Sequence, residues 1–172
     1  MIAAQTLVGK VVDERTTSYR VNDTLLYALA TGFGADPLDT DELRYVYEEN
    51  LRALPCMSLV LGYPGFWLKQ PEYAVDWPRV LHAEESFEIH APLPVAGTVT
   101  GRTDITAVID RGDKGAFIHS RKEVRLADDG TLLATVRSLS VARGDGGCGS
   151  AGRVDTPPIG AVPSLRAPDH VC

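Results

Sequence analysis

His82 is the side chain of this sequence that is best suited to acid-base chemistry. It precedes two carboxylates, Glu84 and Glu85, at the start of a run that alternates apolar and polar residues. An imidazole beside a carboxylate can shuttle a proton near neutral pH. A structural histidine whose ring hydrogen-bonds to the main chain would leave the same pattern, so the residues alone support both interpretations.

The motifs of covalent and metal catalysis are missing from the sequence. It has no Gly-x-Ser-x-Gly nucleophile elbow, no catalytic Cys-His pairing and no His-Glu-x-x-His. Cys56, Cys148 and Cys172 are odd in number and far apart, so we expect free thiols and no metal site.

Bulk composition narrows the function classes further. The chain has 172 residues, of which 44% are hydrophobic and 23% charged, which is ordinary for one globular domain. Its formal net charge of -6 argues against a nucleic-acid or anionic-membrane partner. No run approaches the roughly 20 apolar residues of a membrane span, and no signal peptide is evident, so we expect a cytoplasmic protein.

Before residue 80 the sequence predicts short elements. Residues 17–21 favour a strand, Asn22 or Asp23 an N-cap for a helix that ends at Gly32 and Gly34, and residues 43–48 a second strand. Between Pro55 and residue 78 prolines and glycines are too dense for a long helix, since an interior proline costs about 3 kcal/mol. We expect only single turns there.

After residue 80 the sequence predicts an antiparallel meander. Residues 80–90, 97–110, 115–127 and 132–143 are rich in Val, Ile, Thr and Phe, and turn residues separate them. Gly144, Gly146 and Gly149 have the spacing of a dinucleotide-binding loop, but residues 154–158, Val-Asp-Thr-Pro-Pro, cannot supply the helix that such a loop requires. We therefore expect a domain over 1–143 and a linker or tail over 144–172.

Several segments together resemble a known family. They are Val-Leu-His-Ala-Glu-Glu-Ser-Phe-Glu-Ile-His-Ala-Pro-Leu-Pro-Val-Ala-Gly at 80–97, Tyr-Ala-Leu-Ala at 27–30, Tyr-Glu-Glu at 47–49, Leu-Pro at 54–55 and Asp-Lys-Gly at 113–115. In combination they resemble the N-terminal half of the (R)-specific enoyl-CoA hydratases, the MaoC-like hot dog enzymes of type-2 multifunctional beta-oxidation proteins.

The resemblance implies an α+β hot dog fold, an antiparallel sheet with a reduced or broken central helix. The space that the helix vacates would form a tunnel for an acyl chain. Such pockets are mostly apolar with a few polar anchors. The candidates for contact with the substrate are Tyr27, Phe33, Tyr47, Phe66, Trp67 and His82.

In the family, the catalytic Asp and His lie in the C-terminal half, on a Tyr-Arg-Leu-Ser-Gly-Asp-x-Asn-Pro-x-His stretch that this sequence lacks. Phe33 stands where that stretch has its Asp. The resemblance therefore implies that the chain alone is inactive and that a catalytic hot dog half joins it, in cis or in trans. The partner half would pair with the edge strand that a lone hot dog domain leaves exposed, and a second copy of this chain in a homodimer could pair with the same strand. Glu48, in the Tyr-Glu of the family, and His82 remain catalytic candidates, and for His82 we favour the structural interpretation.

The activity implied is reversible addition of water to a trans-2-enoyl-CoA, giving a (R)-3-hydroxyacyl-CoA. The coenzyme A thioester is the substrate, and no cofactor is expected. Two alternatives remain open. A hot dog thioesterase would need a carboxylate over the thioester, for which Glu48 is the candidate. A non-catalytic subunit would bind acyl-CoA without turnover.

Overall fold

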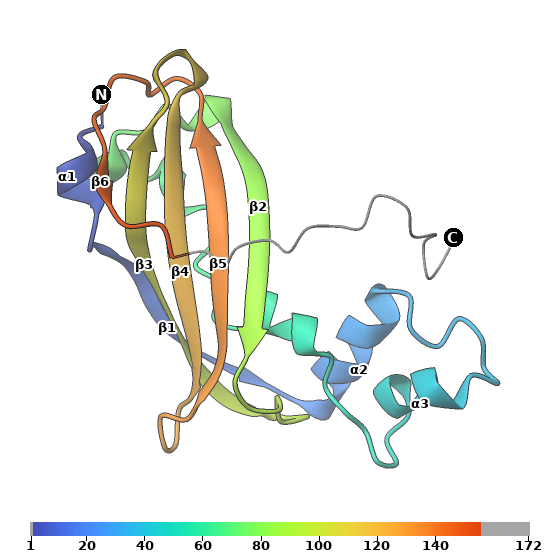
Figure 1. Ribbon diagram of the computed structural model, residues 1–172. Coiled ribbons are helices and arrows are strands. Elements are labelled where there is room, and N and C mark those ends of the chain that lie inside the picture. The colour runs from blue at the N-terminus through green and yellow to red at the C-terminus, as the bar shows by residue number, and fades with distance from the viewer. Residues whose placement is uncertain (1, 156–172) are drawn as a thin grey trace.

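Six antiparallel strands form one curved sheet in this computed structural model, which describes residues 2–155 (Figure 1). The strands lie in the order β1-β3-β4-β5-β2, and the short β6 pairs with β3. Their bounds are Val11–Tyr19 for β1, Val80–Ile89 for β2, Gly97–Asp110 for β3, Ala116–Leu126 for β4, Leu132–Ala142 for β5 and Ala151–Gly152 for β6. The predicted meander is confirmed as β2 to β5.

The first strand is longer than predicted, because β1 begins at Val11 rather than at residue 17. It lies at one edge of the sheet and pairs with β3 alone. Most of its side chains are exposed. Because this edge strand carries polar residues on both faces, its sequence shows little of the apolar-polar alternation that marks a half-buried strand. Only Tyr19, at its end, is buried.

Three short α-helices precede β2: α1 (Ala4–Leu7), α2 (Val21–Ala30) and α3 (Thr40–Val46). The predicted helix is confirmed as α2. Its N-cap is Arg20 rather than Asn22 or Asp23, and the Asp23 carboxylate accepts the Arg20 N–H at 2.8 Å. Figure 1 shows α2 and α3 to one side of the sheet, near the end of β2, and not across its face.

The predicted strand over 43–48 is wrong, because these residues belong largely to α3. Asp39 caps the helix, its Oδ1 accepting the N–H groups of Asp41 at 2.8 Å and Glu42 at 3.1 Å. Acidic residues in the first turn and Arg44 in the last turn complement the helix dipole. These local signals outweigh the alternation of Leu43 with its neighbours that suggested a strand.

No long helix crosses the sheet in the described residues. The proline-rich stretch forms four 3₁₀ helices, η1 (Pro55–Leu59), η2 (Trp67–Lys69), η3 (Pro71–Tyr73) and η4 (Trp77–Arg79). Prolines stand at the start of η1, η3 and η4, where a missing N–H costs nothing. This confirms the predicted broken central helix. We call the sheet face that residues 55–79 cover the inner face.

Two groups of buried side chains hold these turns on the inner face. Near one end of the strands, Trp67 and Tyr73 belong to a cluster with Ile105 and Ile118. Toward the other end, a second cluster joins η1 to the sheet, and its members are Tyr19, Met57, Leu61, Leu93, Val99, Val124, Leu133 and Ala134.

The start of the predicted tail lies against the sheet. β6 pairs with β3, and Cys148 is buried in the first cluster. The Asp110 carboxylate accepts the N–H groups of Gly112, Gly147 and Gly149 at 2.8, 3.1 and 3.0 Å, and these bonds lower its pKa. The boundary after residue 143 stays a prediction, and residues 156–172 lie outside the described range.

Cys56 and Cys148 are free thiols, as predicted. Cys172 lies outside the described residues. Across residues 2–155, no helix is long and apolar enough to cross a membrane.

Candidate functional site

A cavity of about 470 Å³ opens on the inner face, between the 3₁₀ turns and strands β2 to β5. One wall is apolar and comes from the turns; it includes Leu59, Val60, Tyr63, Phe66, Trp67 and Leu68. The opposite side comes from the sheet, where Val80 and Val136 lie among polar side chains. We call these polar side chains the polar floor, and they are His82, Glu85, Thr103, Ser120, Lys122, Ser138 and Ser140.

Strand register explains how the polar floor forms. Ser120 on β4 lies opposite Ser138 on β5, which in turn lies opposite Glu85 on β2. Thr103 on β3 lies opposite Lys122 on β4 in the neighbouring row. Alternate residues of a strand point to the same face, so these side chains share the inner face with the core residues on either side of them.

Lys122 is buried, with 5% of its surface exposed. Its Nζ donates to the carbonyl oxygens of Ser58 at 3.0 Å, Leu59 at 2.8 Å and Leu61 at 2.8 Å. An ammonium has three N–H donors, so all of them serve these carbonyls. Burial lowers the pKa of Lys122 to about 8, an effect that the nearby Glu85 carboxylate opposes. The side chain therefore ties the end of η1 to β4.

His82 and Glu85 stand at the mouth of the cavity on β2, the free edge of the sheet. The His82 Nε2 lies 3.7 Å from the Glu85 Oε2, and 62% of the His82 side chain is exposed. A bulge between His82 and Glu84 shifts the alternation of β2 by one residue. As a result, the side chains of His82 and Glu85 share the inner face. This separation is longer than a hydrogen bond, so the contact between the two side chains is a loose one.

The cavity brings together Phe66, Trp67 and His82 from the predicted site residues. Trp67 is buried and meets the Tyr73 ring edge-on, with the centroids 4.9 Å apart. Phe66 is 44% exposed and packs against Trp77.

The other four predicted site residues lie away from this cavity. Tyr27 packs beside the second core cluster and donates its hydroxyl to the Cys56 carbonyl at 3.0 Å. Phe33 meets the ring of Tyr45 at 5.2 Å between centroids. Tyr47 and Glu48 lie in an exposed bend after α3. Their roles in binding or catalysis stay predictions without support from this cavity.

Sequence reasoning missed most of the polar floor. Thr103, Ser120, Lys122 and Ser138 each lie within a predicted strand, at positions that share a face with buried aliphatic residues such as Ile118. Counting by two along each strand from its buried positions would have assigned them to the inner face. Their significance depends on the cavity, which only the packing of the 3₁₀ turns creates.

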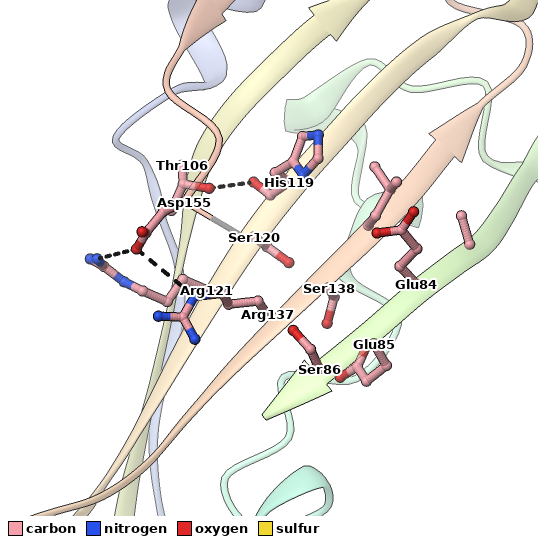
Figure 2. Close-up of a pocket in the computed structure, with 12 residues that line it drawn as sticks. Glu84, Glu85, Ser86, Thr106, His119, Ser120, Arg121, Arg137, Ser138 and Asp155 are labelled. Atoms are coloured by element: carbon pink, nitrogen blue, oxygen red, sulfur yellow. Dashed lines mark hydrogen bonds and ion pairs between the residues drawn. The ribbon is translucent and has the colours of Figure 1, made fainter. Parts of the chain in front are cut away.

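The opposite, outer face of the sheet carries a second cavity of about 540 Å³, whose lining also includes Glu85, Ser120 and Ser138 of the polar floor (Figure 2). Arg121 and Arg137 lie directly opposite each other there, and Asp155 lies 4.0 and 3.9 Å from them. Arg121 also pairs with Asp104 at 3.4 Å, and Arg137 pairs with Glu88 at 3.4 Å. The two guanidinium charges are thus paired with carboxylates, although the buried Nε atoms of both arginines have no hydrogen-bond partner within residues 2–155.

His119 also lines the outer cavity, where Thr106 donates to its carbonyl oxygen at 3.3 Å (Figure 2). Burial lowers the pKa of its imidazole, which favours the neutral form at pH 7. Within residues 2–155, no group of three or more His, Cys, Asp or Glu side chains has the arrangement of a metal site.

Comparisons with known proteins agree with this architecture. A family model described as the MFE-2 hydratase 2 N-terminal domain matches residues 17–144. Enoyl-CoA hydratase ChsH3 of Mycobacterium tuberculosis is 35% identical over 159 residues, which cover 88% of this chain and 53% of that protein. The peroxisomal enoyl-CoA hydratase 2 of Arabidopsis thaliana is 29% identical over 148 residues, 82% of this chain and 48% of that protein.

Among solved structures, a MaoC-like dehydratase from Phytophthora capsici superposes with a TM-score of 0.69 at 28% identity, covering 92% of this chain and 54% of that one. The R-hydratase PhaJ1 of Pseudomonas aeruginosa, with a TM-score of 0.53 at 16% identity over 90% of this chain and 92% of that one, shares the fold. These similarities confirm the predicted hot dog fold. The chain spans about half the length of the curated relatives that it matches.

Proposed function

We propose that this chain, which belongs to the family of MFE-2 hydratase 2 N-terminal domains, is the acyl-CoA-binding half of an (R)-specific enoyl-CoA hydratase. The whole enzyme would add water across the double bond of a trans-2-enoyl-CoA, with the hydroxyl going to C3 and a proton to C2. In this scheme the present chain binds and orients the acyl group and excludes bulk water from it.

The inner-face cavity is the observation that carries the proposal. Where a hot dog domain usually has a central helix, residues 55–79 form 3₁₀ turns and leave about 470 Å³ open. The aromatic wall of Tyr63, Phe66 and Trp67 offers an acyl chain an apolar surface. Burial of apolar surface contributes about 25 cal/mol per Å², so a long acyl chain gains substantial binding energy there.

The catalytic Asp and His are proposed to come from a second hot dog half, in cis or in trans, because the sequence has no Gly-Asp-x-Asn-Pro-x-His stretch. The exposed edge of β2 supports this arrangement. Leu81 is 53% and Phe87 41% exposed there, and an edge strand offers unpaired backbone groups to another sheet. A homodimer formed through the same edge remains the alternative assembly.

The enoyl-thioester absorbance provides the test. We expect the purified chain alone to leave trans-2-enoyl-CoA unchanged while binding it, and hydration to begin when a catalytic-half protein is added. Hydration by the chain alone would contradict the proposal and would assign acid-base roles to His82 and Glu85, the titratable pair at the cavity mouth. Failure to bind any acyl-CoA, with the fold intact, would also refute it.

A non-catalytic acyl-CoA-binding subunit is the second candidate, favoured by the missing Asp-His stretch. Binding without hydration, even in the presence of catalytic halves, would identify it. The thioesterase alternative stays a prediction, and its candidate carboxylate, Glu48, is exposed and does not line the inner-face cavity. A cytoplasmic location stays a prediction, and three of the relatives are described as peroxisomal.

A further inference from the structure

We propose that the inner-face cavity selects acyl groups that carry neutral oxygen atoms, as hydroxyls or ketones, over pure hydrocarbon chains. This inference rests on the proposed function and specifies its substrate class. It comes from the contrast between the two sides of the cavity, an apolar wall of turns and a polar floor of strands.

The polar floor lies where a hydrocarbon chain would need apolar contacts. The hydroxyl-bearing Ser120 and Ser138 face each other across β4 and β5, and Ser140 follows on β5 at the next position of the same face. A hydrocarbon lying on these groups would displace the water that hydrates them and offer no hydrogen bond in return. That loss opposes binding.

Thr103 adds an unpartnered group to the same surface. Only 3% of this residue is exposed, and its Oγ1 is buried with no hydrogen-bond partner in the described part of the chain. A buried hydroxyl without a partner is unfavourable, and such groups are usually paired in folded proteins. Thr103 lines the cavity, so a change of its χ1 rotamer would turn this hydroxyl toward an oxygen atom of the occupant.

The charges of the floor favour a neutral oxygen over an anionic one. The Lys122 ammonium uses its three N–H donors on the carbonyls of residues 58, 59 and 61, so none remains for an acidic group. The Glu85 carboxylate, at the mouth, would repel a second carboxylate but can accept a hydrogen bond from a hydroxyl. An acyl chain that ends in a carboxylate is therefore disfavoured.

Binding of matched acyl-CoA pairs to this chain tests the inference. The probes are dodecanoyl-CoA and the hydroxydodecanoyl-CoA isomers that carry the hydroxyl in the distal half of the chain, measured by calorimetry. A wholly apolar tunnel would bind every hydroxylated isomer more weakly than dodecanoyl-CoA. We expect the opposite for at least one isomer, with a gain of about fivefold or more, the ratio that one well-placed hydrogen bond gives.

Variants link the preference to the floor. Ser138→Ala and Thr103→Val should each reduce the ratio of the two affinities toward or below one. Ser86→Ala is the matched control. Ser86 lies opposite Arg137 on the outer face and does not line the inner-face cavity, so its loss should leave the ratio unchanged. Thermal unfolding checks that each variant retains the fold.

The possible outcomes separate this inference from the proposed function. If dodecanoyl-CoA binds and every hydroxylated isomer binds more weakly, the oxygen preference is refuted while the acyl-CoA-binding function stands. An unchanged preference in both floor variants would likewise refute the assignment to the polar floor. If no acyl-CoA binds to the folded chain, both ideas fail together.

Discussion

The ammonium nitrogen of Lys122, on the central strand β4, lies 2.8 Å from the carbonyl oxygen of Leu61. This hydrogen bond holds the turn that follows η1 against the sheet. Two further carbonyls, of Ser58 and Leu59, complete its hydrogen bonds. This arrangement fixes the apolar wall of the cavity to its polar floor, and it accounts for a buried lysine in a strand whose other inner-face residues, apart from Ser120, are aliphatic.

Replacing Lys122 by Met should destabilise the fold, because three buried carbonyls lose their donor. We expect the free energy of unfolding to fall by about 2–4 kcal/mol, consistent with buried acceptors left unsatisfied. Urea unfolding measures the change. Lys114→Met is the control, since Lys114 is exposed in the η5 turn (Gly112–Lys114) and its loss should change stability by less than about 0.5 kcal/mol. Equal effects of the two variants would contradict the tethering role.

The pH dependence of stability should reveal the same lysine. Its pKa is lowered from an ordinary 10.5 to about 8 by burial, so the folded state releases the proton at a lower pH than the unfolded state does. The unfolded state then binds more protons between these values, and stability rises with pH across this window.

This contribution is isolated by comparing the wild type with Lys122→Met, in which other titrating groups cancel. The difference in unfolding free energy should move in favour of the wild type by as much as about 3 kcal/mol from pH 8 to pH 10.5. Below pH 8 the difference should be flat. A difference that is independent of pH throughout would show that Lys122 titrates normally.

Gly62 and Gly101 approach each other where the turns cross β3. A Cβ on Gly62 would lie 2.5 Å from the Gly101 Cα, and Gly62 also has a φ of +61°. Gly65, with a φ of +73°, has open space around it. Gly65→Ala therefore measures the cost of the backbone conformation alone, roughly 1 kcal/mol.

Gly62→Ala should cost about 3 kcal/mol or more, because the backbone must also move away from β3. It should weaken acyl-CoA binding as well, since the apolar wall follows Gly62 directly. Chemical denaturation and calorimetric titration give the two values. Similar costs for the two alanines would show that the crossing is looser than described.

His82→Asn tests where the acid-base chemistry resides. If a second half supplies the catalytic pair, the kcat of the assembled enzyme should fall by less than about tenfold, whereas loss of a general acid or base costs about 10²–10⁴-fold. Glu48→Gln provides a comparison outside the cavity and should leave kcat unchanged, because Glu48 is exposed after α3. A large loss in His82→Asn with normal substrate binding would place His82 in the chemistry.

Leu81→Lys tests the edge of β2 as the seam between halves. A charge in place of a 53% exposed leucine on a free edge should oppose pairing with another sheet. The association of this chain with a second hot dog half, or with a second copy of itself, should weaken by about tenfold or more. Leu38→Lys is the control, because Leu38 is 85% exposed in the loop before α3. Sedimentation at several concentrations compares the two variants. Undiminished association of Leu81→Lys would place the seam elsewhere.

The sequence determined the elements whose signals are local. Long runs of Val, Ile and Thr between turn residues predicted β2 to β5, and the prolines of residues 55–78 excluded a central helix, because both effects act on the backbone within a few residues. The resemblance to the hydratase family rested on β2 with the proline corner after it and on short motifs elsewhere, at 27–30, 47–49, 54–55 and 113–115. The prediction of a strand over 43–48 was wrong because two local signals compete there. The alternation of residues favours a strand, whereas the Asp39 N-cap favours the helix α3, which the structure has.

Tertiary structure alone decided the site. Thr103, Ser120 and Ser138 come from three strands, and only the register of the sheet places them on one floor. The turn carbonyls that hold Lys122 lie more than 60 residues away in the sequence. Such contacts depend on how distant segments pack, which no local preference encodes, and they separate Phe66 and Trp67 at the cavity from Tyr27 and Phe33 outside it.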